Sequence, residues 1–150
     1  MGIMGSNMTE DAVLALLDVA ARIERRLDHH LSATRGVSFS EYRLLKALSE
    51  AGTHGAMRVA AAEAVGLTPS AVTRALRPLE KIGLVTTERH ERDARRSMAA
   101  LTPAGAELLG DAERIVADVL DTLPVNGLPI ETLAGLQREL GAPRAARRHP

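Results

Sequence analysis

The chain has 150 residues, 45% apolar and 25% charged, so it is long enough for one domain with a sizeable core and too apolar for a disordered protein. It contains no Cys, which excludes a structural disulfide and a thiol redox switch. Its longest apolar run, residues 12–17, is far below the ~20 residues that span a bilayer, and no signal peptide is apparent, so we expect a cytoplasmic protein that does not enter the membrane.

The 19 basic and 19 acidic residues balance overall but are unevenly distributed. Basic minus acidic residues give 4 − 5 = −1 for residues 1–37, 3 − 3 = 0 for 38–67, 7 − 4 = +3 for 68–102, 2 − 7 = −5 for 103–140 and +3 for 141–150. Positive charge therefore concentrates in residues 68–102 and in the tail, as expected when one face of a protein meets phosphates.

The N-terminal part predicts a leader followed by one long helix. Residues 1–8 resemble a vector remnant or a disordered leader. Thr9 is a suitable N-cap, and apolar residues then recur at helical spacing: Leu16, Ala20, Ile23, Leu27 and Leu31. A helix over residues 9–36 with so broad an apolar face needs a partner, and a second subunit is a natural one.

Residues 38–50 predict a second helix. Ser38 and Glu41 have the spacing of a capping box, and Tyr42, Leu45 and Leu48 are expected to face inward. Phe39 and Tyr42 are the only aromatic residues in the chain. Because single-stranded nucleic acids are bound largely by stacking on aromatic rings, this class of ligand is disfavoured.

A helix-turn-helix is predicted next. Residues 56–65 form a short Ala-rich helix that Gly66 ends, and Thr68 and Pro69 begin another as N-cap and first helical residue. This second helix is expected to bury Val72, Leu76, Leu79 and Ile82 and to expose Ser70, Thr73, Arg74 and Arg77 before Gly83 ends it. Pro78 is expected to bend its second half.

The rest of the chain predicts a hairpin and two helices. Two short extended runs flank a tip rich in Arg, residues 91–96. Thr102 and Pro103 begin a long helix, which Pro124 ends, and residues 130–140 form the last helix. The final residues carry three Arg; a solvated terminus and a weak non-specific DNA contact are both open interpretations.

This order of patterns resembles the winged helix-turn-helix of the MarR (multiple antibiotic resistance regulator) family of bacterial transcription factors. The matching residues are Gly66-Leu67-Thr68, Val72-Thr73-Arg74, the run from Leu79 to Val85, and Asp93-Ala94-Arg95 ahead of Leu101-Thr102. The resemblance covers roughly Ala12 to Leu140. Ala61, where the family usually has Leu, and Pro78 depart from it.

The resemblance implies a mainly α fold of about six helices, with a winged helix-turn-helix lobe, a small β-hairpin wing and a helical dimerisation region. We accordingly divide the chain into a leader (1–8), an N-terminal dimerisation helix (9–36), a winged helix-turn-helix (37–102), C-terminal dimerisation helices (103–141) and a mobile basic tail (142–150). We expect a sequence-specific regulator that binds double-stranded DNA as a homodimer on a pseudo-palindromic operator. We also expect this regulator to be a ligand-responsive repressor.

Candidate DNA contacts fall in two segments. The major groove, about 12 Å wide, admits one helix, which would present Thr68, Ser70, Ala71, Thr73, Arg74 and Arg77. In the family, an Arg of the wing enters the minor groove and an Asp two residues earlier holds it in place. The resemblance places these roles on Arg95 and Asp93, and Arg89, Arg92 and Arg96 would contact the DNA backbone. The alternatives are solvated surface charges on the helix and a merely polar hairpin tip.

The homodimer would bury apolar residues of the first helix and of the last two. Those expected to contact the partner are Leu16, Ile23, Leu27, Leu120, Leu123, Leu133 and Leu136. Two recognition helices ~34 Å apart would then read the two half-sites.

No cofactor is expected, but the family commonly responds to small aromatic acids, phenols or drugs. His29, His30 and Arg43 are the candidate residues of an effector pocket, although isolated His and Arg residues are more often surface residues. No His spacing favours a metal site, and no phosphate loop, metal motif or nucleophile elbow indicates an enzyme. The alternative function is a winged-helix protein-interaction module without specific DNA binding.

Overall fold

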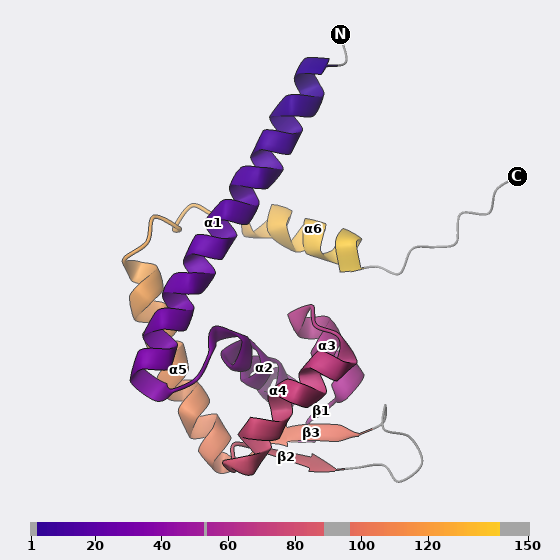
Figure 1. The fold of residues 1–150 in the computed structure, drawn as a ribbon, viewed down its shortest axis with the longest axis vertical. Helices are drawn as coiled ribbons and strands as arrows, with labels where there is room; N and C mark the ends of the chain where they lie inside the picture. Colours follow the sequence, from indigo (N-terminus) through magenta and orange to yellow (C-terminus); the bar gives the residue numbers. More distant parts are fainter. Residues whose placement is uncertain (1–2, 53, 89–96, 142–150) are drawn as a thin grey trace, which may run out of the picture.

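The computed structural model describes residues 3–52, 54–88 and 97–141. Within these ranges the chain forms six helices and one three-stranded sheet (Figure 1). The elements are α1 (Ile3–Arg35), α2 (Phe39–Glu50), β1 (Ala56–Met57), α3 (Arg58–Val65), α4 (Pro69–Lys81), β2 (Val85–Glu88), β3 (Met98–Leu101), α5 (Pro103–Asp121) and α6 (Ile130–Gly141). The predicted mainly α fold with a winged helix-turn-helix is confirmed.

The core lies where α2, α3 and α4 meet the sheet. Leu44, Leu45 and Leu48 of α2 are fully buried, and Val72 and Leu76 of α4 pack in the same cluster. The alternation of apolar and polar residues at helical spacing produces this core, because it gives each helix one face to bury. It holds the helix-turn-helix together as one lobe.

Side-chain caps begin three of the helices, as their sequences predict. Ser38 and Glu41 form the capping box of α2, in which the Ser38 hydroxyl accepts from the Glu41 N–H at 3.1 Å. Thr68 caps α4 by accepting from the Ala71 N–H at 3.2 Å, and Thr102 caps α5. At the end of α3, Gly66 has a φ of 68°, the left-handed conformation that closes the turn before α4.

The antiparallel sheet has the order β1-β3-β2. β2 pairs with β3 from Val85 opposite Leu101 to Glu88 opposite Met98. β1 was not predicted, and the helix predicted from Ala56 begins at Arg58 instead. Ala56 and Met57 are extended because they pair with Ala99 and Met98, a contact that local sequence does not encode.

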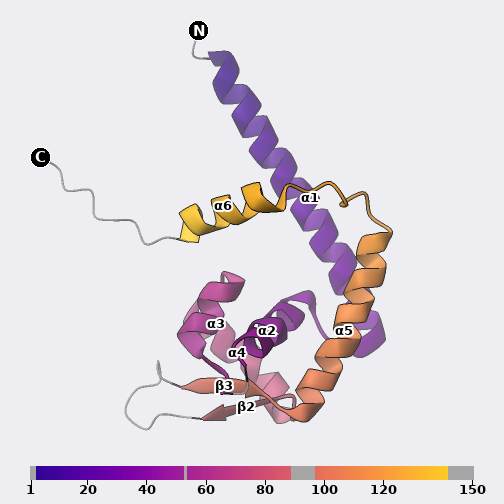
Figure 2. The same cartoon turned by 180° about the vertical axis from the view of Figure 1, so that it is seen from behind.

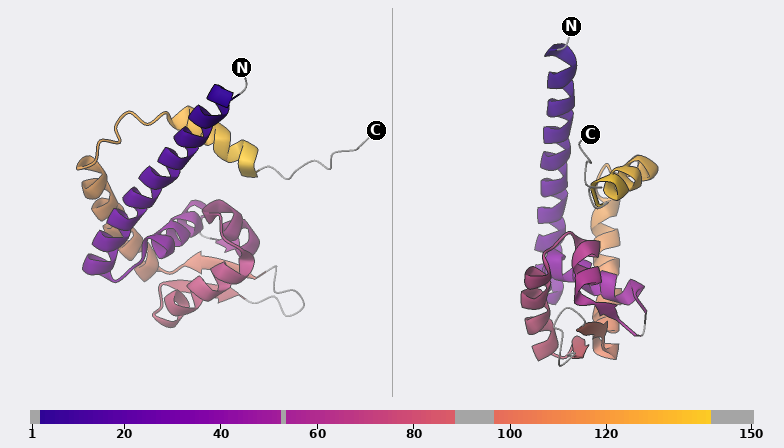
Figure 3. Two further views of the ribbon diagram at one scale, coloured as in Figure 1. Left: turned by 45° about the horizontal axis from the view of Figure 1, so that its top comes forward. Right: turned by 90° about the vertical axis from the view of Figure 1, so that its right-hand side faces the viewer.

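α1 is longer than predicted. It begins at Ile3, so residues 3–8 of the expected leader are helical and Thr9 lies inside the helix rather than at its N-cap. The C-terminal part of α1 packs against α5, beside which it lies in Figure 2, and it buries Leu27 and Leu31. Its N-terminal part extends beyond the rest of the molecule (Figure 3), and residues 7–20 are exposed throughout.

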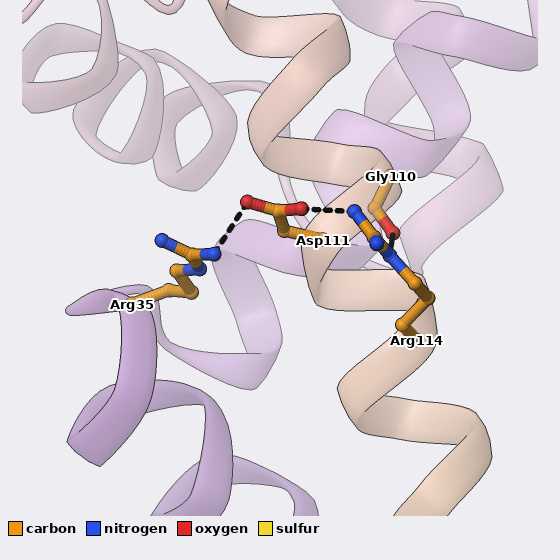
Figure 4. A network of polar contacts seen from close by, with 4 residues as sticks. All are labelled: Arg35, Gly110, Asp111 and Arg114. Carbon is orange, nitrogen blue, oxygen red and sulfur yellow. Dashed lines mark hydrogen bonds and ion pairs between the residues drawn. The ribbon is translucent and has the colours of Figure 1, made fainter.

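Polar contacts fix the lower end of α1 against α5. The Arg35 guanidinium lies 2.6 Å from the Asp111 carboxylate, which also pairs with Arg114 on the same helix (Figure 4). About two turns earlier in α1, Asp28 accepts a hydrogen bond from the Phe39 N–H at 2.8 Å and so anchors the start of α2. The end of α1, α2 and α5 therefore form one connected frame.

A second link joins α2 to α5. The Lys46 ammonium donates to the Glu113 carboxylate at 3.2 Å, and this hydrogen bond is the main cause that raises the pKa of Lys46 above its ordinary value. Both side chains are about half exposed (45% and 47%), so the pair adds little to stability.

Among the described residues, the helices lack an apolar stretch of the length that a membrane span requires.

Candidate nucleic-acid interface

The helix α4 presents one polar side to solvent. Val72, Leu76 and Leu79 are buried in the lobe, whereas Arg74 and Arg77 are exposed. Thr68 and Ser70 are also exposed in the first turn, and Ala71 and Thr73 are half-buried. The six residues predicted to contact DNA from this helix thus lie away from its core-facing side.

One predicted core position of this helix is wrong. Ile82 is 67% exposed. The reason is that α4 ends at Lys81, so Ile82 is the C-cap, with φ −94° and ψ 6°, and leaves the helical path before it can reach the core. The helix itself runs without interruption through Pro78.

The guanidiniums of α4 are available for an external anion. Within the described residues neither Arg74 nor Arg77 forms an ion pair with an acidic side chain. The dipole of α4 also favours negative charge at the exposed N-terminus of this helix. This side of α4 can therefore receive phosphates.

The strands β2 and β3 are the two legs of the predicted wing (Figure 1). The wing residues predicted to contact DNA, Arg89, Arg92, Asp93, Arg95 and Arg96, lie outside the described residues. The described part of the hairpin places both legs directly after α4 in the same lobe.

Arg58 joins this surface although its sequence pattern did not indicate it. It is the first residue of α3, and its backbone N–H donates to the Ser97 carbonyl at 3.1 Å, at the start of the returning wing strand. Its Nη1 lies 3.5 Å from the Thr73 Oγ1 on α4. Only an isolated Arg in an Ala-rich segment marked the position in the sequence, and that signal has no periodicity.

Comparison with known proteins agrees with this geometry. Residues 37–97 match the model of the MarR family. The winged helix-turn-helix of this chain is thus similar to that of the MarR family. No curated protein sequence matches the chain significantly.

Solved structures of other proteins share this fold over most of the chain. The regulator BldR from Sulfolobus solfataricus is 24% identical with a TM-score of 0.70, over 93% of this chain and 98% of that one. CouR from Rhodococcus jostii RHA1, bound to p-coumaroyl-CoA, is 23% identical with a TM-score of 0.75 over 91% and 96%. Sco3205, a MarR family regulator from Streptomyces coelicolor in complex with DNA, is 25% identical with a TM-score of 0.72 over 87% and 82%.

The residues predicted for a MarR-type effector pocket separate in the structure. His30 lines a hollow of about 360 Å³ between α1 and α5, together with Ile115 and Asp118. His29 lines a different hollow of about 720 Å³, formed by α1 residues. Arg43 is exposed on α2 and lines neither of these two. No group of three metal-ligating side chains occurs in the described part of the chain.

The residues predicted to form a MarR-type dimer differ in exposure. Leu16 and Leu136 are 47% and 46% exposed. Ile23, Leu120, Leu123 and Leu133 are half-buried. Leu27 is only 5% exposed within the single chain, so its place at a subunit interface is not supported.

Proposed function

We propose that this protein is a MarR-family transcriptional regulator that binds double-stranded DNA sequence-specifically, as a homodimer on a pseudo-palindromic operator. The observation that carries the proposal is the division of α4 into a buried apolar face and an exposed side on which Arg74 and Arg77 form no ion pair within the described residues. Arg can bond bidentately to guanine in the major groove, while Thr68 and Ser70 are placed to contact phosphates. Such a regulator acts in the cytoplasm, where its DNA is.

The wing extends this contact in the proposal. Arg95, held by Asp93, enters the minor groove, where a narrow A/T-rich segment concentrates negative potential. Arg89, Arg92 and Arg96 contact the backbone, and the alternating basic residues give the hairpin tip its positive charge. The structure of Sco3205 in complex with DNA supports DNA binding by a protein of this fold.

Two helical segments that are little packed within one chain favour a homodimer. The N-terminal part of α1 exposes Val13, Leu14, Leu16 and Leu17, and α6 has no buried residue at all. Amphipathic helices of this kind gain stability by packing, which a single copy does not provide. We therefore propose that α1, the end of α5 and α6 form the subunit interface, and that residues 37–102 form the DNA-binding lobe.

The salt dependence of binding tests the proposal against a protein-interaction module. We expect the affinity for a DNA duplex to fall steeply with salt, because each phosphate contact releases counterions. The probe is a duplex selected by the protein from a random pool, and the measurement is fluorescence anisotropy at several salt concentrations. Selection without enrichment, or an affinity independent of salt, would contradict DNA binding and favour the interaction module.

We further propose that the protein is a repressor released by a small effector bound in the α1–α5 hollow. The hollow joins an apolar wall from Ile115 and Val119 to polar groups from His30 and Asp118. Because the Asp118 carboxylate would repel an anion, a neutral phenol fits this lining better than an aromatic acid. The CouR structure, with p-coumaroyl-CoA bound, supports effector binding by this fold.

The effector proposal predicts different responses to two matched compounds. Phenol derivatives should raise the thermal midpoint of the protein and weaken its DNA binding, and the benzoates of the same shape should do neither. His30→Ala should remove the response to the phenols. An equal response to both compounds, or an unchanged response in the variant, would show that this hollow is not the effector site.

A further inference from the structure

The hydroxyl of Thr73 is already committed within the protein. Its Oγ1 donates to the Pro69 carbonyl at 3.0 Å, one turn earlier in α4. The same oxygen accepts a long hydrogen bond of 3.5 Å from the Arg58 Nη1. A hydroxyl has one proton and two lone pairs, so Thr73 retains one lone pair and no proton for a ligand.

This state restricts what Thr73 can recognise in DNA. Phosphate oxygens, guanine O6 and N7 and thymine O4 are all acceptors, and an acceptor-only hydroxyl does not bond to them. The donors in the major groove are the exocyclic amino groups of adenine (N6) and cytosine (N4). Thr73 is half-buried on the polar side of α4, between Ser70 and Arg77 on the helix surface.

The Arg58 side chain contributes little that would stabilise the fold. Its Nε is buried and has no hydrogen-bond partner among the described residues. A buried donor without a partner is unfavourable, and the side-chain hydrogen bond from Arg58 to Thr73 is long. Its backbone, by contrast, is held by the hydrogen bond to Ser97, so the guanidinium starts from a fixed point beside α4.

We infer that Arg58 is a positioning residue of the DNA-reading surface, and that it fixes the Thr73 hydroxyl as an acceptor for a base amino group in the major groove. This inference rests on the proposed function. Arg58 itself contacts no DNA in this arrangement. It contributes to selectivity at one base pair because it keeps the Thr73 hydroxyl proton directed at the Pro69 carbonyl and the free lone pair of that hydroxyl directed at the groove.

The test compares variants on the duplex selected by the wild-type protein and on its single base-pair substitutions. Thr73→Val and Arg58→Met should each lose about 3- to 10-fold of the preference for adenine or cytosine at the same one position, the value of one neutral hydrogen bond. Thr73→Ser and Arg58→Lys should retain most of it. The double variant should lose no more than Thr73→Val alone, because both act through one hydroxyl.

Two further readouts separate positioning from other roles. Arg58→Met should keep the salt slope of the wild type, since no phosphate contact is lost, and its thermal midpoint should not fall, since the buried Nε–H has been removed. Lys81→Met is the charge-loss control: it removes one positive charge from the exposed last turn of α4 and should leave the base preference unchanged.

The opposite results overturn the inference. A salt slope reduced by about one in Arg58→Met would make Arg58 a phosphate contact. A lower thermal midpoint with unchanged base preference would make it structural, and additive losses in the double variant would separate it from Thr73. If Arg58→Met does not fold, the Thr73→Val variant is a sufficient test: an unchanged base preference in this variant overturns the inference. A wild-type protein without any sequence preference would instead overturn the proposed function.

Discussion

Arg95 is the residue whose replacement should most clearly separate DNA binding from folding. In the proposal its guanidinium lies in the minor groove and supports no core contact. Arg95→Ala should therefore weaken operator binding by ~1–3 kcal/mol and leave the thermal midpoint and the oligomeric state unchanged. An anisotropy titration measures the affinity.

The matched control for this prediction is Arg92→Ala, which removes the same charge from the segment predicted as the wing tip. Because Arg92 is a proposed backbone contact, Arg92→Ala should weaken binding to selected and unrelated duplexes equally. Arg95→Ala should weaken binding most where the flanking sequence is A/T-rich. Equal effects of the two variants on every duplex would remove the minor-groove assignment.

Single residues also show where sequence patterns stop being informative. Val72, Leu76 and Leu79 could be assigned to the core from spacing alone, because a regular helix repeats its faces. Ile82 has the same spacing but lies one residue past the end of the helix. The role of Arg58 depends on a partner on another helix and on a third segment at Ser97, and no local pattern records either contact.

At the level of elements, the start of α5 is tightly fixed to the turn after α4. Thr102 donates its N–H to the Leu84 carbonyl at 3.1 Å and its hydroxyl to the Gly83 carbonyl at 2.6 Å. Gly105, in the first turn of α5, lies so close that a Cβ would be 2.0 Å from the Leu84 oxygen. Only glycine fits this approach of helix and backbone.

Gly105→Ala should therefore destabilise the protein by about 1–3 kcal/mol, since the obstructing atom belongs to the backbone. Gly110→Ala is the matched control in the same helix, where a Cβ would meet nothing within 4 Å, and it should stabilise by about 0.5–1 kcal/mol. Chemical denaturation of both variants measures the free energies of unfolding. Equal stability of the two would show that α5 does not approach the lobe this closely.

Helix boundaries could be predicted where a local signal, such as a side-chain cap, marks them. The caps Ser38, Thr68 and Thr102 each act on a backbone N–H three residues later, so the signal is local. The start of α1 carries no such device, and the helix continues through the predicted cap Thr9 to Ile3. β1 exists only because a distant strand pairs with it.

For the whole molecule, the central question is what covers α6 and the first half of α1. Leu16→Asp and Leu136→Asp change residues that are about half exposed in one chain, so the fold of a single subunit should tolerate them. If both lie at the subunit interface, each should raise the dimer dissociation constant at least ~10-fold, because a buried Leu would be replaced by a charge. Analytical ultracentrifugation measures this constant.

Ile82→Asp is the control for association, since Ile82 is 67% exposed in the DNA-binding lobe and lies on neither α1 nor α6. It should leave the dimer intact. Monomeric wild-type protein at micromolar concentration, or equal effects of all three variants, would contradict the proposed interface.

The most direct measurement is a dimethyl-sulfate footprint of the protein on its selected duplex, which reports guanine N7 in the major groove and adenine N3 in the minor groove, combined with the mass of the complex. The account predicts one dimer per duplex, with two protected major-groove segments about one helical turn, ~34 Å, apart and minor-groove protection on their outer flanks. A single protected segment bound by one chain, or no protection at all, would contradict it.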